Sequence, residues 1–300
     1  MTAIALSDVV KDFPTGDGPV RAVDHVNLML DPGEVVAFLG PNGAGKSTCI
    51  DMMLGLTDPT HGTVQVHGGS PRAAVQAGRI GAILQSGGLL DDLTVHQTLT
   101  MIATLHPGRI DLDTLMRRTN LTPLASRRVS HCSGGERQRL RFALALIPDP
   151  DILILDEPTA GMDVNARAEF WATTHQEAAN GQTVLFATHY LKEAQDFADR
   201  IILIAEGRIV ADGTVDEIRR LGAGRSVSAH WPGWTPDISL PGVTHHEREG
   251  ERVRWWADDS DALALHLLTS TAATDLEITT ADLDTAFAAL TRTTTTGAPA

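Results

Sequence analysis

The chain has 300 residues and a net charge of −14, which argues against nucleic acid as its main partner, because proteins that hold phosphate backbones carry a basic face. Its longest apolar runs, Val35–Leu39, Ile152–Leu155 and Ile201–Ala205, fall far short of the roughly 20 residues that a membrane-spanning helix needs. Two cysteines, Cys49 and Cys132, make no disulfide framework and indicate a reducing compartment.

Short apolar runs alternate with helical patterns up to about residue 220, which is typical of an α/β domain. The run Val35–Leu39 predicts a buried strand, and a glycine-rich turn and a helix over Lys46–Leu54 follow it. Further runs bounded by Gly, Asp or Pro predict four more core strands, at Ile80–Leu84, Ile152–Leu155, Val184–Ala187 and Ile201–Ile204.

The pattern becomes helical between Leu93 and Ile147. Val95, Leu99 and Ile102 recur at helical spacing, and similar spacing follows over 112–116 and 140–144. We therefore expect a helical subdomain over about residues 87–148, inserted between two strands of the sheet.

The composition changes after residue 221. No lysine occurs beyond Lys192, and four of the five tryptophans follow residue 230, where we expect them to form a separate core. Val253–Trp255 predicts a strand, and Asp261–Ser270 and Leu283–Leu290 predict helices. The predicted organisation is an α/β domain over 1–221, a small α+β domain over 222–290 and a disordered tail over 291–300.

A phosphate-binding loop is predicted between the first core strand and its helix, where the sequence reads Gly40-Pro41-Asn42-Gly43-Ala44-Gly45-Lys46-Ser47-Thr48. Its glycines let successive backbone N–H groups point at a phosphate, and the helix N-terminus adds partial positive charge. In this interpretation Lys46 contacts the β- and γ-phosphates of ATP, and the Ser47 hydroxyl binds Mg²⁺. The alternative is a glycine-rich turn without a ligand, which the strand–loop–helix context disfavours.

Two carboxylates end the apolar strand Ile152–Leu155. Asp156 is expected to orient Mg²⁺ through a water, since Mg²⁺ keeps much of its hydration shell. Glu157 is expected to act as general base on the attacking water. Taken alone, this Asp-Glu pair could be a helix-capping turn, but its combination with the phosphate loop favours the functional interpretation.

The stretch Cys132–Arg139, with Ser133-Gly134-Gly135 opening a helix, resembles the signature sequence of ABC ATPases. The resemblance runs from about Ala3 to Leu221. It implies the ABC-type P-loop nucleotide-binding fold with a helical subdomain, followed here by a small C-terminal α+β domain. Four further positions match the family's adenine-stacking aromatic, Q-loop, D-loop and switch histidine, namely Phe13, Gln85, Thr159–Asp163 and His189.

The family's mechanism implies an ATP-sandwich homodimer that hydrolyses Mg-ATP. Ser133, Gly134 and Gly135 would face the γ-phosphate held by the second chain, and Asp163 would run across the dimer interface. Gln85 would contact Mg²⁺ and water, and His189 would hold the attacking water in line.

Three of these assignments have a simpler alternative without a functional role. Gln85 could be an ordinary loop glutamine, His189 a surface histidine at a strand end, and Phe13 a core residue.

The signature sequence departs from the family pattern at two positions: Cys132 stands where leucine is usual, and Glu136 stands where glutamine is usual. A negative charge at Glu136 is expected to weaken the attraction for a γ-phosphate and slow the site.

The cassette resembles the ATPase subunits of bacterial antibiotic- and drug-resistance exporters, and Asp275–Ile278 with Asp282–Leu290 resembles the end of that group. The resemblance implies a peripheral subunit at the cytoplasmic face of the cell membrane. A separate integral-membrane permease would carry the substrate and dock near Gln85–Leu99. Alternatives are a soluble ABC ATPase acting on the ribosome or DNA, an importer ATPase, and a scaffold that no longer hydrolyses ATP.

Overall fold

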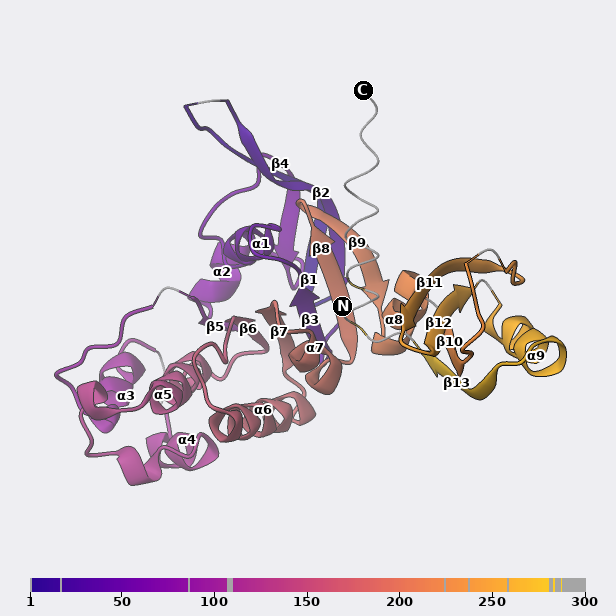
Figure 1. Ribbon diagram of the computed structural model, residues 1–300. Coiled ribbons are helices and arrows are strands. Elements are labelled where there is room, and N and C mark those ends of the chain that lie inside the picture. Colours follow the sequence, from indigo (N-terminus) through magenta and orange to yellow (C-terminus); the bar gives the residue numbers. More distant parts are fainter. Residues whose placement is uncertain are drawn as a thin grey trace. The chain divides into compact units, whose positions relative to one another are not determined.

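The computed structural model describes residues 2–16, 18–85, 87–106, 110–223, 225–236, 238–257, 259–280, 283 and 287 (Figure 1). They form two compact units, one up to residue 209 and one from residue 210 on. The predicted domain boundary after Leu221 lies further along the chain, within α8 (Val215–Ala223). The predicted tail, 291–300, and the predicted helix Leu283–Leu290, apart from Leu283 and Phe287, lie outside the described residues.

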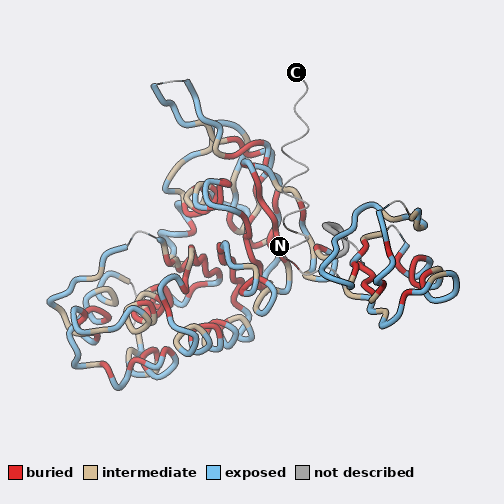
Figure 2. Tube along the Cα trace, in the orientation of Figure 1, coloured by how far each residue is buried: buried red, intermediate tan, exposed pale blue. Residues whose placement is uncertain are grey.

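A six-stranded sheet has the order β5-β6-β7-β3-β8-β9, and all of its strands lie in the first unit except β9, which continues past residue 209. Its strands β3, β6 and β7 are buried along their whole length, which agrees with the apolar runs that predicted them (Figure 2). The strands are β3 (Val35–Leu39), β5 (Ile80–Ile83), β6 (Ile152–Asp156), β7 (Thr183–Thr188), β8 (Arg200–Ala205) and β9 (Arg208–Gly213).

The register of this sheet decides which loops meet. The pairs β3–β7, β3–β8, β5–β6 and β6–β7 are parallel, so the carboxyl ends of these strands lie at one edge. Leu39 pairs with Thr188, and Asp156 pairs with Ala187. The residues that follow each strand therefore come to the edge where ligands bind in open parallel sheets.

An antiparallel sheet that the sequence analysis did not predict completes the strands of the first unit. It has the order β2-β1-β4, with β1 (Ile4–Phe13), β2 (Val20–Leu30) and β4 (His61–Val66). The register of β1 against β2 shifts at several points, and Asp8 has a φ of 52°. These irregularities break the apolar–polar alternation by which a strand is recognised. Side chains of this sheet and of α1 (Lys46–Met53) join the core of the parallel sheet.

Helices of the first unit fill the connections between parallel strands (Figure 1). The block between β5 and β6 holds α3 (Val95–Ala103), α4 (Leu112–Arg118) and α5 (Gly134–Leu146), at the predicted place in the chain. The other helices are α2 (Pro71–Gln76), α6 (Val164–Ala179) and α7 (Leu191–Phe197). Among the described residues, none of the helices is both long and apolar enough to cross a bilayer.

The described residues of the second unit form an antiparallel sheet, on which helix α9 packs. The sheet has the order β11-β12-β10-β13, and its apolar core includes Trp231, Trp234 and Trp255 beside α9. Trp256 lies outside this core and is only partly buried, because neighbouring residues of a strand face opposite sides of the sheet. The centroid of its ring lies 5.1 Å from that of His245. Its elements beyond α8 are β10 (Arg225–His230), β11 (Val243–Glu249), β12 (Arg252–Ala257), α9 (Ser260–Ser270) and β13 (Thr274–Thr280).

Candidate nucleotide site

The loop between β3 and α1 makes turns that require glycine. Gly45 has a φ of 103°, and a Cβ there would lie 2.4 Å from the backbone oxygen of Ala22. A Cβ at Gly40 would lie 2.3 Å from the oxygen of Ile204. Two β-strands therefore press against the loop, and only a residue without a side chain fits at these positions.

Lys46 is buried at the start of α1. Its Nζ donates to the carbonyl oxygens of Gly40 at 2.6 Å and Pro41 at 3.0 Å. Burial lowers the pKa of this ammonium, and the nearby carboxylates of Glu157 and Asp156 oppose the shift. The carbonyl oxygens of the loop thus hold the Lys46 ammonium in a position from which it can bind a phosphate.

Ser47 and Asp156 form an oxygen pair beside this lysine. The Ser47 hydroxyl donates to Asp156 Oδ2 at 2.9 Å, although 109 residues separate the two in the chain. Asp156 is 4% exposed, and burial raises the pKa of its carboxyl despite the Ser47 hydrogen bond. One carboxylate and one hydroxyl fit Mg²⁺, which is usually bound by one or two protein oxygens together with phosphates and waters.

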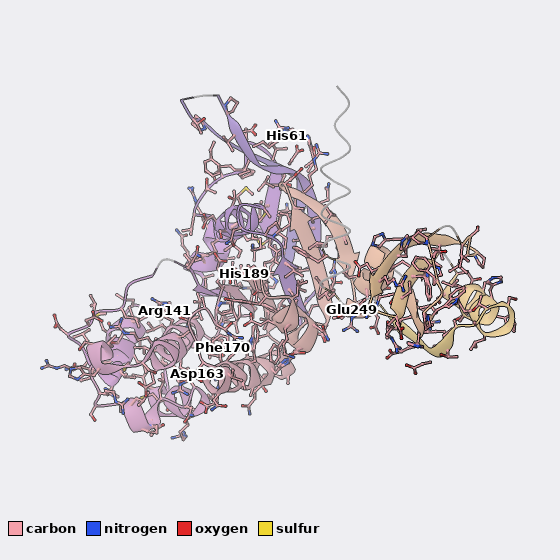
Figure 3. All side chains as sticks on the ribbon, in the orientation of Figure 1. His61, Arg141, Asp163, Phe170, His189 and Glu249 are labelled. Carbon is pink, nitrogen blue, oxygen red and sulfur yellow. The ribbon has the colours of Figure 1, made fainter. Side chains whose placement is uncertain are left out.

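Glu157 and His189 meet at the carboxyl ends of β6 and β7. The Nδ1–H of His189 donates to Glu157 Oε1 at 2.8 Å, and Figure 3 shows His189 in the first unit near these strand ends. Glu157 has a φ of 48°, and its N–H donates to the carbonyl oxygen of Ala187 at 3.0 Å. A glutamate held in this left-handed conformation is strained, and such strain clusters at functional sites.

A cleft of about 480 Å³ brings half of the predicted site residues together. It is lined by Ala22, Asn42, Gly43, Gly45, Lys46, Ser47, Thr48, Gln85, Asp156 and Glu157. Gly40, Pro41 and Ala44 shape the loop behind it, and His189 reaches it through Glu157. The sequence analysis missed Ala22, because this residue belongs to β2, which carried no recognisable strand pattern.

Phe13 ends β1 and is not among the residues that line this cleft. Its side chain is 41% exposed, and the Nζ of Lys11 lies 5.1 Å from its ring centroid. The alternative that Phe13 is a core residue is therefore wrong, while its contact with adenine stays a prediction.

The signature residues lie at the start of α5, outside the cleft of their own chain. Ser133 Oγ accepts from the N–H of Glu136, and Glu136 Oε2 accepts from the N–H of Ser133 at 2.8 Å, which closes a capping box. A Cβ on Gly135 would lie 2.9 Å from the Cβ of Ala166 in α6, and one on Gly134 would lie 3.5 Å from the oxygen of Gly161. Glycine thus lets α6 approach the first turn of α5.

Glu136 does not stand as an isolated negative charge. Both of its oxygens accept from Arg127 Nη1, at 2.8 and 3.0 Å. Burial works against ionisation of Glu136, but the Ser133 N–H and Arg127 together hold the pKa of its carboxyl below the usual value. The sequence analysis missed Arg127, because nothing in the spacing of the two residues indicates an ion pair.

Asp163 caps α6, where its Oδ1 accepts from the N–H of Ala166 at 2.9 Å. Its side chain is exposed and lies outside the cleft, so within one chain the structure gives it a local capping role. The expected contact of Asp163 across a dimer interface stays a prediction.

Comparison with known proteins agrees with this geometry. The sequence profile of the family described as ABC transporter matches residues 23–160. The Nod factor export ATP-binding protein I of Burkholderia pseudomallei (strain 1710b) is 38% identical, over 64% of this chain and 65% of its own length. The daunorubicin resistance ATP-binding protein DrrA3 of Streptomyces coeruleorubidus is 37% identical, over 73% of this chain and 70% of its own length.

A solved dimeric structure of an ATP-binding cassette in a post-hydrolysis state, bound to ADP and Pi, is also similar. Its TM-score is 0.64 at 25% identity, and the match covers 70% of this chain and 98% of that one. The phosphate loop, its strand-end carboxylates and these relatives together show that the chain belongs to the ABC transporter family and carries its ATP-binding ATPase domain.

Proposed function

We propose that this chain hydrolyses Mg-ATP at the cleft between the phosphate loop and the ends of β6 and β7. The observation that carries the proposal is that two hydrogen-bonded pairs of residues lie at one site. Ser47 and Asp156 are suited to bind a metal ion, and Glu157 and His189 are suited to activate a water. Both pairs join residues far apart in sequence at one edge of the sheet. Mg²⁺, when bound, neutralises charge on the phosphate oxygens.

The residues of the chain would divide the chemistry among them. Lys46 stabilises negative charge on the phosphates, and the backbone N–H groups of the loop orient them. The Glu157 carboxylate accepts the proton of the attacking water. His189 holds that carboxylate through its Nδ1–H, and its ring is 40% exposed, so its other nitrogen can reach a γ-phosphate. Gln85 lines the same cleft and would sense the metal and the water.

A second copy of the chain would complete each site. Ser133, Gly134 and Gly135 form a helix N-terminus suited to a phosphate, yet they do not line the cleft of their own chain. The similarity to a dimeric cassette bound to ADP and Pi supports an arrangement in which they face the partner's ATP. Closure of two chains around two ATP molecules would then precede hydrolysis.

The closed and open dimers would power a separate integral-membrane subunit at the cytoplasmic face of the membrane. Two of the relatives are named for export of Nod factor and for daunorubicin resistance, which supports an exporter of drug- or antibiotic-like molecules. Gln85 follows β5 and precedes the helical block, so a permease docked on that block would respond to the state of the nucleotide.

Phosphate release by the purified chain, with and without Mg²⁺, tests the activity. The Lys46→Ala variant is the control, and we expect it to lower kcat/KM for ATP by about 10²–10³, since it removes one charge-stabilising donor. Equal turnover by this variant would contradict the proposed site.

Purification of the tagged chain from gently solubilised membranes of its own host tests the proposed partnership with a membrane subunit. A polytopic membrane protein recovered in stoichiometric amount supports the transporter role. Recovery with ribosomes or DNA and without a membrane protein would leave the ATPase intact and overturn the exporter proposal.

A further inference from the structure

Glu193, in the short helix α7, is a buried carboxylate that the cleft does not include. It is 2% exposed and lies behind the loops that follow β6 and β7. A carboxylate removed from water costs several kcal/mol unless hydrogen bonds and a positive charge compensate it. The contacts of Glu193 therefore indicate what this carboxylate holds in place.

Two hydroxyl groups hydrogen-bond the two oxygens of Glu193, and one arginine forms an ion pair with it. The hydroxyl of Thr159 donates to Oε1, and the hydroxyl of Thr188 donates to Oε2 at 3.0 Å. Arg167 from α6 places its Nε 3.3 Å from Oε1 and forms an ion pair. Both threonines are buried, at 1% and 0% exposure, so water does not replace these bonds.

The two threonines stand beside the two residues assigned to water activation. Thr159 follows Glu157 by two positions, and Thr188 immediately precedes His189. The Thr188 hydroxyl also accepts from the N–H of Tyr190 at 3.0 Å, so it fixes the backbone on both sides of His189. One carboxylate thus fastens the loop after Glu157 to the loop that carries His189.

Arg167 adds a second connection to the His189 loop. Its guanidinium lies 5.5 Å from the ring centroid of Tyr190, and that ring lies 4.0 Å from the ring of His189. Two sets of contacts therefore hold the residues around the 2.8 Å hydrogen bond between Glu157 and His189: the hydrogen bonds of Glu193, and the packing of Arg167 on Tyr190. Neither set touches the cleft itself.

We propose that Glu193 is a positioning residue for ATP hydrolysis, which sets the distance between Glu157 and His189 by clamping Thr159 and Thr188. The inference rests on the proposed roles of Glu157 and His189. Because a misplacement of about 1 Å can cost about 10²-fold in rate, loss of the clamp lowers turnover without lowering ATP affinity.

Glu193→Ala is the direct test. We expect kcat for ATP hydrolysis to fall by about 10–100-fold, while the Kd for ATP measured without hydrolysis changes by less than about threefold. Glu193→Gln keeps the shape and one acceptor oxygen, and it restores part of the lost kcat. Thr188→Val, which removes one hydroxyl and preserves volume, lowers kcat in the wild type and has little further effect in Glu193→Ala.

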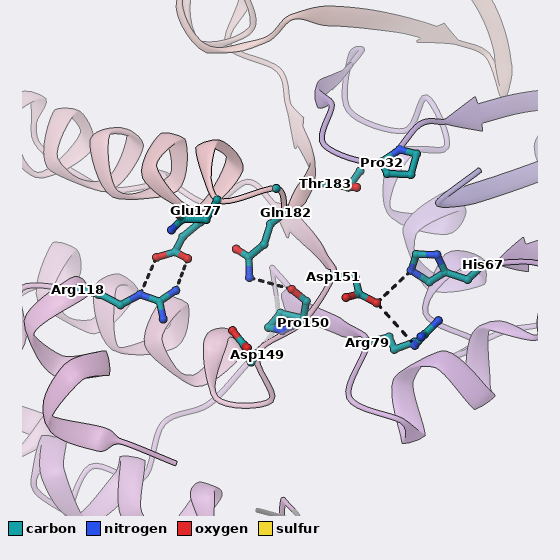
Figure 4. Close-up of a pocket in the computed structure, with 12 residues that line it drawn as sticks. Pro32, His67, Arg79, Arg118, Asp149, Pro150, Asp151, Glu177, Gln182 and Thr183 are labelled. Carbon is teal, nitrogen blue, oxygen red and sulfur yellow. Dashed lines mark hydrogen bonds and ion pairs between the residues drawn. The ribbon is translucent and has the colours of Figure 1, made fainter. Parts of the chain in front are cut away.

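Glu177 in α6 offers a matched control. It is also 2% exposed and is held by Arg118 through two hydrogen bonds, one of them 3.1 Å long (Figure 4). It lines a separate cavity of about 760 Å³ that shares no residue with the nucleotide cleft. Glu177→Ala should lower the Tm, as Glu193→Ala does, and leave kcat within about twofold of wild type.

The outcomes separate this inference from the proposed function. If Glu193→Ala hydrolyses ATP as fast as Glu177→Ala, or if both lose activity in proportion to Tm, then Glu193 has no positioning role. A fall in ATP affinity that accounts for the whole loss of rate also overturns it. A wild-type chain without ATPase activity would instead overturn the proposed function.

Discussion

Single buried residues in this protein serve the site at the expense of the fold. Asp156 lies at the end of a strand buried on both faces, and burial raises the pKa of its carboxyl. The folded chain then binds the proton more tightly than the unfolded chain. Ionised Asp156 therefore destabilises the protein at neutral pH, and this destabilisation disappears as the pH falls toward the unfolded value near 4.

Asp156→Asn should raise the Tm of the nucleotide-free protein at pH 7 by on the order of 2–4 °C, because it removes this buried charge and keeps an oxygen for Ser47. The gain should shrink as the pH is lowered toward 4, and it should be accompanied by loss of Mg²⁺-dependent ATPase activity. Thermal melts across this pH range check the expectation. A Tm gain that does not change with pH would show that the Asp156 charge is not the cause.

A second prediction at this scale concerns the unusual glutamate of the signature sequence. Since Arg127 neutralises Glu136, Glu136→Gln alone should change the KM for ATP by less than about threefold. Arg127→Gln exposes the uncompensated carboxylate and should raise the KM more, and the double variant should return toward wild type. A double-mutant cycle of ATPase rates measures the coupling, and additive effects would contradict charge compensation.

At the scale of elements, the first turn of helix α5 packs closely against helix α6. Gly135 would place a Cβ 2.9 Å from the Cβ of Ala166 in α6, so glycine here serves packing as well as any phosphate contact. The sequence analysis read the Ser-Gly-Gly stretch only as an anion site. The structure adds that one of these glycines, Gly135, sets the spacing between α5 and α6.

Gly135→Ala should destabilise the chain by about 1–3 kcal/mol through overpacking against α6. Ala166→Gly removes the opposing methyl group and should recover part of this loss in the double variant, even though glycine by itself costs about 1 kcal/mol in a helix. Urea unfolding of the four proteins checks the prediction. Equal losses in the presence and absence of Ala166 would show that the two helices do not compete for this space.

At the scale of the whole molecule, the proposed cycle requires two chains. Each cleft holds the phosphate loop and the base, while the signature residues of the same chain lie outside it. In the proposed cycle, a site divided in this way would couple hydrolysis to association, and the movement of the two chains would drive a membrane partner.

Glu157→Gln should remain dimeric in saturating Mg-ATP, because nucleotide binding survives and water activation is lost. Wild type under the same conditions should return to monomer as ATP is consumed. Size-exclusion chromatography with light scattering distinguishes the two states. A Glu157→Gln variant that binds Mg-ATP and stays monomeric would refute the composite site.

The sequence by itself determined the parallel strands, the phosphate loop and the carboxylates at the end of β6. These features depend on neighbouring residues: an apolar run is buried as a strand, and closely spaced glycines followed by a lysine form a loop that binds phosphate. The antiparallel strands β1, β2 and β4 escaped prediction because register shifts along β1 interrupt the alternation of apolar and polar residues.

Only the tertiary structure decided which distant side chains meet. Sheet register joined Ser47 to Asp156 and Glu157 to His189, and helix packing placed Arg127 on Glu136. The hydrogen bonds from Thr159 and Thr188 to Glu193 have no signature in the sequence, since a carboxylate at the third position of a short helix is typical of an exposed charge. Contacts of this kind depend on how elements pack in space, and residue spacing along the chain does not encode them.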